Sequence, residues 1–281
     1  MSLFKIKSYA KINLFLKIKG KYKSGLHKIE TFVSLISLFD EIEINKIKKK
    51  KHSIRFIGKF ASKIGKDNSV NKLLKILEKN SFFKDYKLKI IIKKNIPTMS
   101  GLGGGSMNAA TILRFLISKS YIRLNEDKAL RIADQIGSDV KFGLDNNQKY
   151  LTSNGKLTSI KKKLKLYLII IKPNFGCSTK KIYRGVKNFK KSQKLTLKNC
   201  FNFKDVIKSA NDLEHVVFKT YPIIKNIKAT MSLLPGNIMV RMSGSGSSLV
   251  AYFKTRKASQ NASKILKNKY KNYWCISSKT I

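Results

Sequence analysis

Apolar and polar residues alternate with a period of two through most of the first 44 residues. The stretches "LFKIKSYAKINLFLKI" (3–18) and "IETFVSLISLFDEIEI" (29–44) both place apolar side chains mainly at every second position. This is the spacing of strands that turn one face toward a core. The sequence therefore predicts two long strands, joined by the glycine-containing turn "KGKYKSGLH".

Helical spacing follows at three places, between further strand patterns. "DNSVNKLLKILEKN" (67–80) predicts a helix that is capped near its first residues, and residues 106–120 and "NEDKALRIADQIG" (125–137) predict two more. "YKLKIIIKKNIP" (86–97) predicts a strand that its proline cannot continue. Before it, the basic loop in "NKIKKKKHSIRFIGK" leads into another predicted strand.

The second half begins after the turn-rich stretch "DNNQKYLTSNGK" (145–156), where the strand pattern "KLYLIIIKP" (165–173) starts. We therefore predict an N-terminal domain of residues 1–160 and a C-terminal domain of residues 161–281. After this first strand, the second domain reads as helix, helix, strand, glycine turn, strand, helix and strand. Because strands and helices alternate without a fixed repeat of about 20–50 residues, the pattern predicts an α+β fold and no solenoid.

The composition is that of a folded protein rather than a disordered one. Apolar residues make up 42% of the 281 residues and aromatic residues 10%. The densest apolar run, "LKLYLIII", is too short to span a bilayer, and the N-terminal stretch lacks the long hydrophobic block of a cleavable signal. The three widely spaced cysteines, Cys177, Cys200 and Cys275, argue against a disulfide framework and a zinc site. We therefore expect a cytoplasmic protein with no membrane partner.

The charge balance is strongly basic, with 60 Lys and Arg against 15 Asp and Glu and a net charge of +45. Such a balance usually points to nucleic acid or to an anionic surface. Most of the basic residues, however, are lysines spread along the whole chain together with abundant Ile and Asn. We interpret this as a compositional bias that places lysine on every solvated face. The alternative is that the charge helps to attract phosphorylated substrates.

A cluster of glycines is the most specific feature of the chain. Four of the 16 glycines fall between Gly101 and Gly105, within "NIPTMSGLGGGSMNAATIL" (95–113), and a helical pattern follows at once. Glycines gather where the backbone adopts unusual dihedrals or where a ligand meets main-chain N–H groups. The first turn of a helix adds unsatisfied N–H groups and the positive end of its dipole. The stretch therefore predicts a phosphate site.

Two familiar phosphate loops do not fit this stretch. A Walker A loop ends in Gly-Lys-Ser/Thr, whereas Gly105 is followed by Ser106 and Met107. A dinucleotide fingerprint needs a third glycine or alanine at position 106 and a strand that leads straight in, but "KKNIPTMS" intervenes. The pattern Pro-x-x-x-Gly-Leu-Gly-Gly-Gly-Ser, from Pro97 to Ser106, instead resembles the phosphate loop of the GHMP kinases, a family that includes galactokinase, homoserine kinase and mevalonate kinase.

Further motifs extend the resemblance from Tyr9 to about Phe253, in the order of the family. They are "YAKINLFLKIKGKYKSGLHKIET", "IGSDVKFGL", "SANDLEHVV" and "RMSGSGSSLVAYF". The triple glycine followed by Asn-Ala-Ala is similar to the branch of the family that acts on cytidine diphosphate-methylerythritol. The resemblance implies ATP-dependent phosphorylation of the 2-hydroxyl of that small molecule in non-mevalonate isoprenoid synthesis, giving the 2-phosphate and ADP, with ATP and Mg²⁺ bound. We expect a monomer or homodimer with no specific nucleic-acid partner.

The same resemblance implies the two-domain GHMP kinase fold, of class α+β. Its N-terminal domain would be ribosomal protein S5-like and its C-terminal domain a ferredoxin-like α/β domain, with the active site in the cleft between them. The segment "SANDLEHVV" is expected to be structural. His52 and His215 lack a comparable context and are expected to be surface or helix residues.

The resemblance implies two catalytic residues. Asp139 would be the general base that takes the hydroxyl proton, and Lys11 would lie close to it and stabilise the developing charge. From the residues alone, Asp139 would be a cap or turn residue after a helix. Lys11 and Asn13 lie two apart on a predicted strand and interrupt an apolar face, so both point to one side. An ordinary edge lysine is the alternative for Lys11.

The implied ATP site consists of the glycine loop and of an adenine pocket to which Asn68 and Lys94 are assigned. Lys94 reads equally well as a solvated lysine. Ser106 is implied to contact phosphate or Mg²⁺, and it would do so alone because Met107 occupies a position often held by a second serine. The loop residues of the implied site are Pro97, Thr98, Met99, Ser100, Gly101, Leu102, Gly103, Gly104, Gly105, Ser106 and Met107.

The implied substrate site selects a cytidine. His27 would hydrogen-bond the base and Tyr183 would stack on it. Leu26 stands where the family commonly has a tyrosine on the other face of the base, so the preference of stacked π systems is lost there. The full implied set is Asn13, Leu26, His27, Tyr183, Gly244, Ser245 and Gly246.

Two other functions remain open at this point. The chain could be another small-molecule GHMP kinase, such as a homoserine or mevalonate kinase, whose substrate would not need His27 and Tyr183. It could also be a basic nucleic-acid-binding protein that has kept a kinase-like fold, because fold alone does not grant activity.

Overall fold

The computed structural model describes residues 3–62, 64–83, 85–161, 164–187, 189 and 203–281, so Cys200 lies outside the described residues. The chain forms two compact units that interleave along the sequence. Unit 1 comprises Met1–Lys11, Leu38–Thr98 and Gly103–Asn146, and unit 2 comprises Ile12–Ser37, Met99–Leu102 and Asn147–Ile281. The sequence predicts two consecutive domains with a boundary near residue 160, which is a different kind of division from these two units. That boundary stays a prediction.

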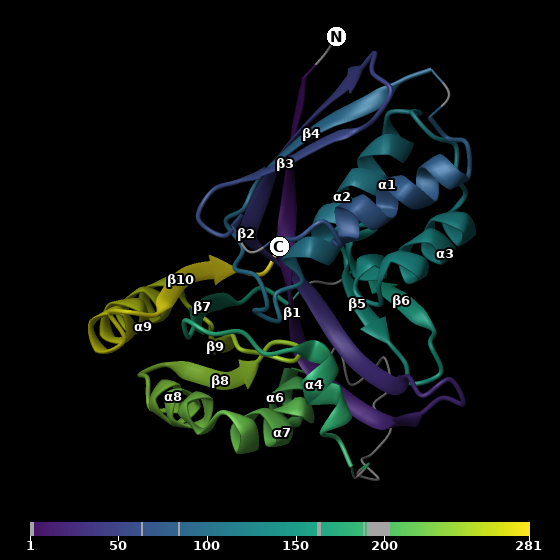
Figure 1. The fold of residues 1–281 in the computed structure, drawn as a ribbon. Coiled ribbons are helices and arrows are strands. Elements are labelled where there is room, and N and C mark those ends of the chain that lie inside the picture. The colour runs from purple at the N-terminus through teal and green to yellow at the C-terminus, as the bar shows by residue number, and fades with distance from the viewer. Residues whose placement is uncertain (1–2, 63, 84, 162–163, 188, 190–202) are drawn as a thin grey trace. The chain divides into compact units, whose positions relative to one another are not determined.

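The two long strands that open the chain are present (Figure 1). Over the described ranges they belong to a six-stranded sheet with the order β3-β4-β2-β5-β6, in which β1 also pairs with β2. The pairing of β3 with β4 is parallel, whereas β4 and β5 pair with β2 antiparallel. The strands are β1 (Phe4–Lys21), β2 (His27–Ile47), β3 (Ser53–Ile57), β4 (Lys87–Lys93), β5 (Gln148–Leu151) and β6 (Leu157–Ile160).

The hairpin of β5 and β6 corrects the sequence prediction, which takes residues 145–156 as turn-rich and assigns no strand there. Gln148 pairs with Ile160 and Leu151 with Leu157, and Gly155 in the connecting turn has φ +89°. Each strand is only four residues long, and all four residues of β5 are buried. A strand this short and buried on both faces carries no alternation, so periodicity cannot reveal it.

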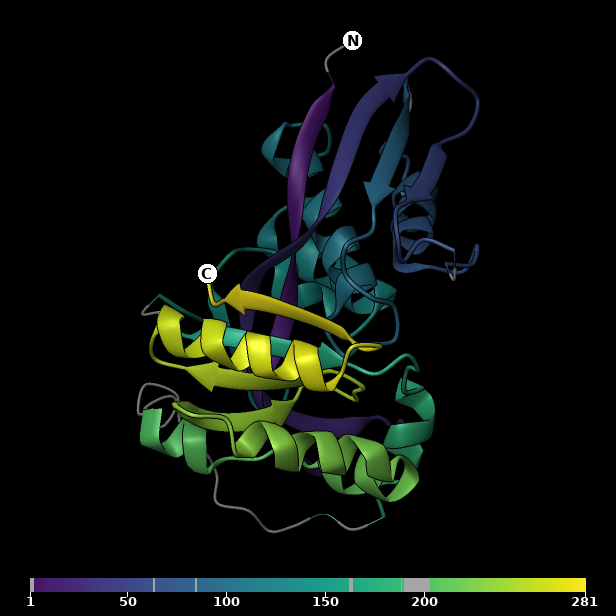
Figure 2. The ribbon, with the colours of Figure 1, turned by 90° about the vertical axis from the view of Figure 1, so that its left-hand side faces the viewer.

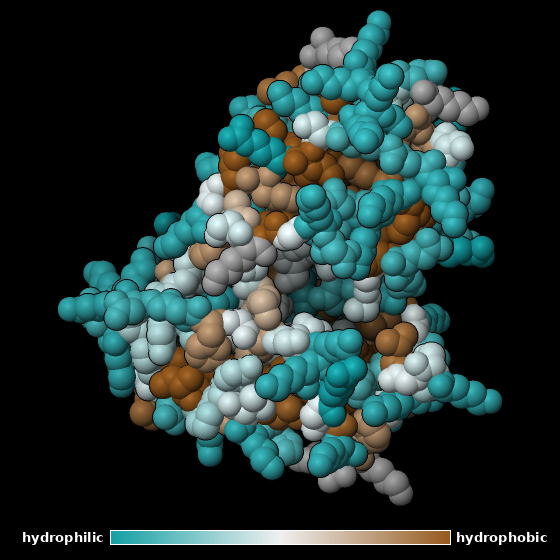
Figure 3. Space-filling view, viewed as in Figure 1, coloured by the Kyte–Doolittle hydropathy of each residue, from teal (hydrophilic) through white to brown (hydrophobic). Residues whose placement is uncertain are grey.

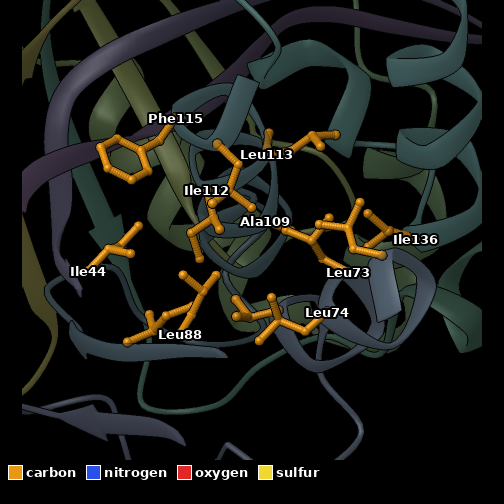
Figure 4. Packing of buried hydrophobic residues seen from close by; sticks show 14 of the residues in the cluster. Ile44, Leu73, Leu74, Leu88, Ala109, Ile112, Leu113, Phe115 and Ile136 are labelled. Atoms are coloured by element: carbon orange, nitrogen blue, oxygen red, sulfur yellow. The ribbon is translucent and has the colours of Figure 1, made fainter. Parts of the chain in front are cut away.

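Three helices of unit 1 pack on alternate residues of β2 and β4. They are α1 (Ser69–Lys79), α2 (Gly104–Ser118) and α3 (Glu126–Ile136), and each confirms a helix predicted from the sequence. Because every second residue of a strand faces the same side, the isoleucines and leucines of β2 and β4 meet the apolar faces of the helices. Figure 4 labels part of this core: Ile44, Leu73, Leu74, Leu88, Ala109, Ile112, Leu113, Phe115 and Ile136.

Unit 2 contains a second sheet, which in the described part of the chain has four antiparallel strands in the order β10-β7-β9-β8. Helices α8 and α9 contribute to one apolar cluster with alternate residues of β7 and β9, so both cover the same face of the sheet (Figure 2). The strands are β7 (Tyr167–Lys172), β8 (Asn237–Met242), β9 (Leu249–Phe253) and β10 (Trp274–Lys279). The helices of this unit are α4 (Thr179–Arg184), α6 (Phe203–Lys208), α7 (Leu213–Thr220), α8 (Pro222–Ser232) and α9 (Arg256–Lys269).

Two helical details differ from the sequence prediction. The first of the two helices predicted early in the second domain, "FKDVIKSANDLEHVVFKTY" (203–221), is divided into α6 and α7, because Asn211 and Asp212 between them bond to backbone elsewhere in unit 2. The short helix α4 was not predicted. Its six residues are fewer than two turns, too few for a helical period to stand out.

Hydrophilic side chains cover most of the face that Figure 3 shows. This is the distribution expected when lysine is spread over solvated surfaces rather than gathered on one element. Within the parts of the chain that are described, no helix combines the length and the apolar character needed to cross a bilayer.

His52 and His215 were both expected to be surface or helix residues, and the structure confirms this for His215 alone. His215 lies on α7 and is exposed, as predicted. His52 precedes β3 and its side chain is only 7% exposed, so it is neither a surface nor a helix residue. It accepts a hydrogen bond from the Leu88 amide and packs against Phe83, which explains its burial.

Candidate functional site

The glycine loop ends in a helix N-terminus that no side chain caps. Gly103 is the residue before α2 and has φ +70°, a left-handed conformation that favours glycine. The first helical hydrogen bond runs from the Met107 amide to the Gly103 carbonyl over 2.8 Å. The amides of the preceding turn have no acceptor within the helix, and the dipole adds partial positive charge there. This end of α2 is therefore suited to bind an anion.

Lys11 and Asp139 form an ion pair beside this helix end, within unit 1. The distance from Lys11 Nζ to Asp139 Oδ2 is 3.1 Å, and the side chains are 3% and 37% exposed. The Lys11 side chain also lies against Gly103, where an added Cβ would come within 2.8 Å of its Cγ. Lys11 thus links the carboxylate to the glycine loop. A buried lysine at this position excludes the alternative of an ordinary edge lysine.

Asp139 occupies the position before a short 3-10 helix, η1 (Val140–Gly143), but its side chain makes no capping hydrogen bond. A cap or turn role, which its place in the sequence would suggest, therefore does not occupy the carboxylate. More than a third of the side chain is exposed, so the carboxylate is accessible for proton transfer.

The segment after Asp139 contacts helices α3 and α2. Lys141 forms an ion pair with Asp134 at 3.0 Å. Gly143 lies so close to α2 that an added Cβ would be 2.7 Å from Ala110 Cβ and 3.0 Å from Met107 Sδ. Met107 is accordingly buried, at 1% exposure, and its side chain serves this contact.

The two residues assigned to adenine both have structural partners in unit 1. Asn68 caps α1, because its Oδ1 accepts hydrogen bonds from the amides of Val70 at 3.1 Å and Asn71 at 3.0 Å. Lys94 is 3% exposed and forms an ion pair and hydrogen bond with Asp40. Lys94 is therefore not a solvated lysine. The contact of either residue with adenine stays a prediction.

Asp40 is a residue that the sequence analysis missed. It is fully buried on β2, in line with Leu38 and Ile42, whose side chains share its face of the strand. An acidic residue in the apolar series of a strand is the same signal that singled out Lys11. Applied to "SLFDEIEI", it would have identified Asp40 as well.

The turn between β8 and β9 packs on the glycine loop, within unit 2. The Ser243 hydroxyl donates to the Gly101 carbonyl at 2.9 Å, and the Ser248 amide donates to the Ser100 carbonyl at 3.1 Å. Gly101 has φ +76°, and an added Cβ would lie 1.9 Å from the Ser243 carbonyl oxygen. A glycine is therefore required at position 101 for two reasons. Ser245 in the same turn is 6% exposed and bonds to the Thr179 hydroxyl at 2.9 Å.

The "NDLE" segment anchors this turn. Asn211 Nδ2 donates to the carbonyls of Met242 at 2.9 Å and Gly244 at 2.7 Å. Glu214 Oε1 accepts from the Met242 amide at 2.8 Å, and Asp212 Oδ2 accepts from the Ile18 amide at 2.8 Å. These contacts explain the structural role expected for the "NDLE" segment, because its polar side chains satisfy backbone groups at the ends of β1 and β8.

Asn211→Ala is expected to lower the free energy of unfolding by about 2–3 kcal/mol, because two buried carbonyls lose their donor. Urea unfolding measures the change. His215→Ala, on the exposed side of α7, is the matched control and should stay within about 0.5 kcal/mol of the wild type. Equal losses in the two variants would contradict the anchoring role of Asn211.

His27 and Tyr183 lie together in unit 2, as the predicted substrate set requires. Their ring centroids are 5.2 Å apart, and the ring of Phe189 lies 6.3 Å from His27. The buried Nε2 of His27 has no hydrogen-bond partner among the residues described. Burial, together with the nearby charge of Lys21, lowers the pKa of His27. Leu26 is 70% exposed.

Asn13 is 2% exposed, and its amide group donates to the Thr31 hydroxyl at 2.9 Å. Across the described ranges, no group of three His, Cys, Asp or Glu side chains is arranged to hold a metal ion. Kinases commonly bind Mg²⁺ through few protein ligands and the phosphates of the nucleotide. The hydroxyl of Ser106, in the first turn of α2, fits such a donor set.

The motifs and the fold agree with comparisons to known proteins. Residues 68–147 match the GHMP kinases N terminal domain, and residues 187–272 match the GHMP kinases C terminal domain. The chain belongs to the GHMP kinase family and has its two-domain α+β fold.

Individual relatives show which members of the family the chain is similar to. The chain is 47% identical over 282 residues to the 4-diphosphocytidyl-2-C-methyl-D-erythritol kinase of Pelagibacter ubique, with 100% of both chains covered. It is 32% identical to the enzyme of the same name from Clostridioides difficile, covering 99% of this chain and 96% of that one. A crystal structure of 4-(cytidine 5'-diphospho)-2C-methyl-D-erythritol kinase has a TM-score of 0.80 at 22% identity, with 99% of each chain covered, and supports the fold.

Proposed function

We propose that this protein transfers the γ-phosphoryl group of ATP to the 2-hydroxyl of 4-diphosphocytidyl-2-C-methyl-D-erythritol, as a step of non-mevalonate isoprenoid synthesis. The full-length likeness to enzymes of that name supports the substrate. The observation that carries the chemistry is the Lys11–Asp139 ion pair, which lies against the last left-handed glycine before α2.

The chain supplies a base and a cation for this transfer. Asp139 accepts the proton of the 2-hydroxyl as its oxygen attacks the γ-phosphorus, and ADP leaves with the electron pair of the broken P–O bond. Lys11 stabilises the negative charge that develops during the transfer. Because Lys11 is held between Asp139 and Gly103, base and cation are preorganised at the phosphate loop.

The nucleotide is bound by the loop of residues 97–107 and the first turn of α2, whose uncapped amides face the phosphates. The Ser106 hydroxyl would donate a hydrogen bond to phosphate or hold the Mg²⁺, which would neutralise phosphate charge when bound. Asn68 and Lys94 complete the ATP site. That the active site lies in the cleft between two domains remains part of this proposal.

At the substrate end, His27 hydrogen-bonds the cytosine and Tyr183 stacks on it. The unpartnered Nε2 of His27 and its contact with the Tyr183 ring support these roles. Asn13, the exposed Leu26 and the turn of Gly244, Ser245 and Gly246 are assigned to the same substrate. An exposed Leu26 leaves one face of the base without an aromatic partner from this position.

The KM for the cytidine substrate is expected to stay constant from pH 8 to pH 6.5 and to rise only at lower pH. Burial holds the pKa of His27 below its ordinary value of 6.5, so the ring stays neutral above that pH. Steady-state kinetics across this range measure the effect, with the KM for ATP as internal control. His27→Phe should raise the substrate KM about tenfold, a loss of one hydrogen bond, and abolish the pH response. A pH response that persists in this variant belongs to another group.

The first experiment measures ADP release from ATP and Mg²⁺ with 4-diphosphocytidyl-2-C-methyl-D-erythritol, homoserine and mevalonate as separate acceptors. Turnover with the first acceptor alone is the expected result. Turnover with homoserine or mevalonate would keep the family and overturn the substrate, together with the roles of His27 and Tyr183.

We also propose that the protein works as a soluble cytoplasmic monomer or homodimer, with no specific nucleic acid or membrane partner. The net charge of +45 is then a property of its lysine-rich surface. Steeply salt-dependent binding to random duplex DNA that persists when Lys11 or Asp139 is replaced would favour the nucleic-acid-binding alternative.

A further inference from the structure

Asp40 and Lys94 form a buried ion pair next to the phosphate loop, and the proposed chemistry does not account for it. Asp40 is 0% exposed on β2, and Lys94, one residue beyond β4, is 3% exposed. Taking both charges out of water is costly, and a pair this deeply buried is weak evidence for stability alone. The pair is therefore a candidate for a functional role.

The same carboxylate also fixes the backbone that leads into the loop. One oxygen of Asp40 pairs with Lys94, while the other accepts the amides of Asn95 at 2.7 Å and Ile96 at 2.9 Å. These residues lie immediately before Pro97, where the glycine loop begins. Asp40 thus positions both the ammonium of Lys94 and the backbone of Asn95 and Ile96, which leads into the glycine loop.

The ammonium of Lys94 lies at the start of α2. An added Cβ on Gly104, the first residue of that helix, would be 3.0 Å from Ile96 Cγ2 and 3.3 Å from Lys94 Nζ. A cation near a helix N-terminus is repelled by the dipole of the helix. Burial also lowers the pKa of Lys94, and Asp40 opposes this change. The repulsion from the dipole is offset when a polyanion occupies the helix end, because its charge is attracted to the lysine and the dipole alike.

We propose that Lys94, positioned by Asp40, is a cation beneath the phosphate loop that strengthens binding of the polyphosphate and does not select the base. The inference rests on the ATP-dependent activity proposed above, and it moves Lys94 from the adenine, to which the resemblance assigned it, to the polyphosphate part of the nucleotide. Both are positioning residues, since a side chain 3% exposed acts through Gly104 and the loop rather than by reaching the ligand.

The test separates phosphate from base with the full-length protein. The double variant Asp40→Asn/Lys94→Met removes both charges, while the asparagine oxygen can still accept the amides of Asn95 and Ile96. Dissociation constants are measured for ATP, GTP, AMP and inorganic tripolyphosphate, together with the thermal midpoint. We expect affinity for ATP, GTP and tripolyphosphate to fall about tenfold alike, that for AMP to fall less than about threefold, and the midpoint to stay near that of the wild type.

Lys93→Met is the matched control, because it removes the same charge one residue away. Lys93 is 53% exposed and pairs with Glu41 at 3.0 Å, and its loss should change every affinity less than about twofold. Lys94→Gln, which can still donate a hydrogen bond to Asp40, is a second variant with the same expected pattern should the double variant fail to fold.

Two outcomes would overturn the inference. Equal losses for ATP and AMP with an altered preference for ATP over GTP would place Lys94 at the base. Unchanged affinities in a folded variant would make the pair structural only. The proposed function is judged separately, by turnover of the wild type: if ATP and tripolyphosphate bind as expected while the methylerythritol substrate is not phosphorylated, the substrate assignment fails and the role of Lys94 stands.

Discussion

Asp139→Asn is expected to lower kcat by about 10²–10⁴-fold, the usual contribution of a positioned general base. The amide keeps the size of the side chain but cannot accept the hydroxyl proton. KM for ATP should stay within about threefold of the wild type, because Asp139 contacts Lys11 rather than the glycine loop. Steady-state ADP release with saturating substrate measures the effect.

Asp134→Asn is the control for this variant. Asp134 lies five positions earlier, is 55% exposed and pairs with Lys141. Its replacement removes a carboxylate of the same segment and should leave kcat within about twofold, as expected for an exposed ion pair. If Asp139→Asn kept more than about a tenth of the wild-type kcat, the general base would have to be another group.

Gly101→Ala is expected to disable the phosphate loop. The left-handed φ of +76° costs alanine about 1 kcal/mol, and its Cβ would come 1.9 Å from the Ser243 carbonyl oxygen. Since the obstacle is backbone, the loop or the turn at Ser243 must shift. The expected results are a loss of about 2–4 kcal/mol in the free energy of unfolding and at least about a tenfold rise in the KM for ATP.

Gly155→Ala is the control that separates the clash with the Ser243 carbonyl from the backbone strain of a left-handed alanine. Gly155 has φ +89°, also left-handed, but the nearest heavy atom to an added Cβ is Tyr22 Oη at 3.8 Å. This variant should lose only about 1 kcal/mol of stability and keep its kinetics. Denaturant unfolding measures the loss of stability in each variant, and ATP kinetics measure the change in KM for ATP. Similar results for the two glycines would mean that contact with Ser243 does not govern the loop.

Local pattern was sufficient for most elements of the fold. The alternation along β1 and β2 and the helical spacing of α1, α2 and α3 predicted these elements, because their amphipathic periods are written in consecutive residues. The glycine loop before α2 was also visible in the sequence, because four glycines directly before a helical pattern are typical of an anion site; its binding of phosphate stays a prediction. The short hairpin of β5 and β6 was not visible in the sequence, because each strand has only four residues and burial of β5 on both faces removes its period.

The sequence by itself singled out the residues that we propose carry the chemistry, and the tertiary structure decided which of them lie together. Lys11 and Asp139 are 128 positions apart, and only folding brings their charges to 3.1 Å. The sequence left Lys94 open between an adenine pocket and a solvated surface, and only the fold shows it buried and paired with Asp40 of β2. The sequence identified Gly101 only as a member of the glycine loop, whereas the carbonyl of Ser243 makes glycine obligatory at this position. The physical reason is the same in each case: side-chain type is local, but distance, burial and the partner of a charge depend on residues far away in the chain.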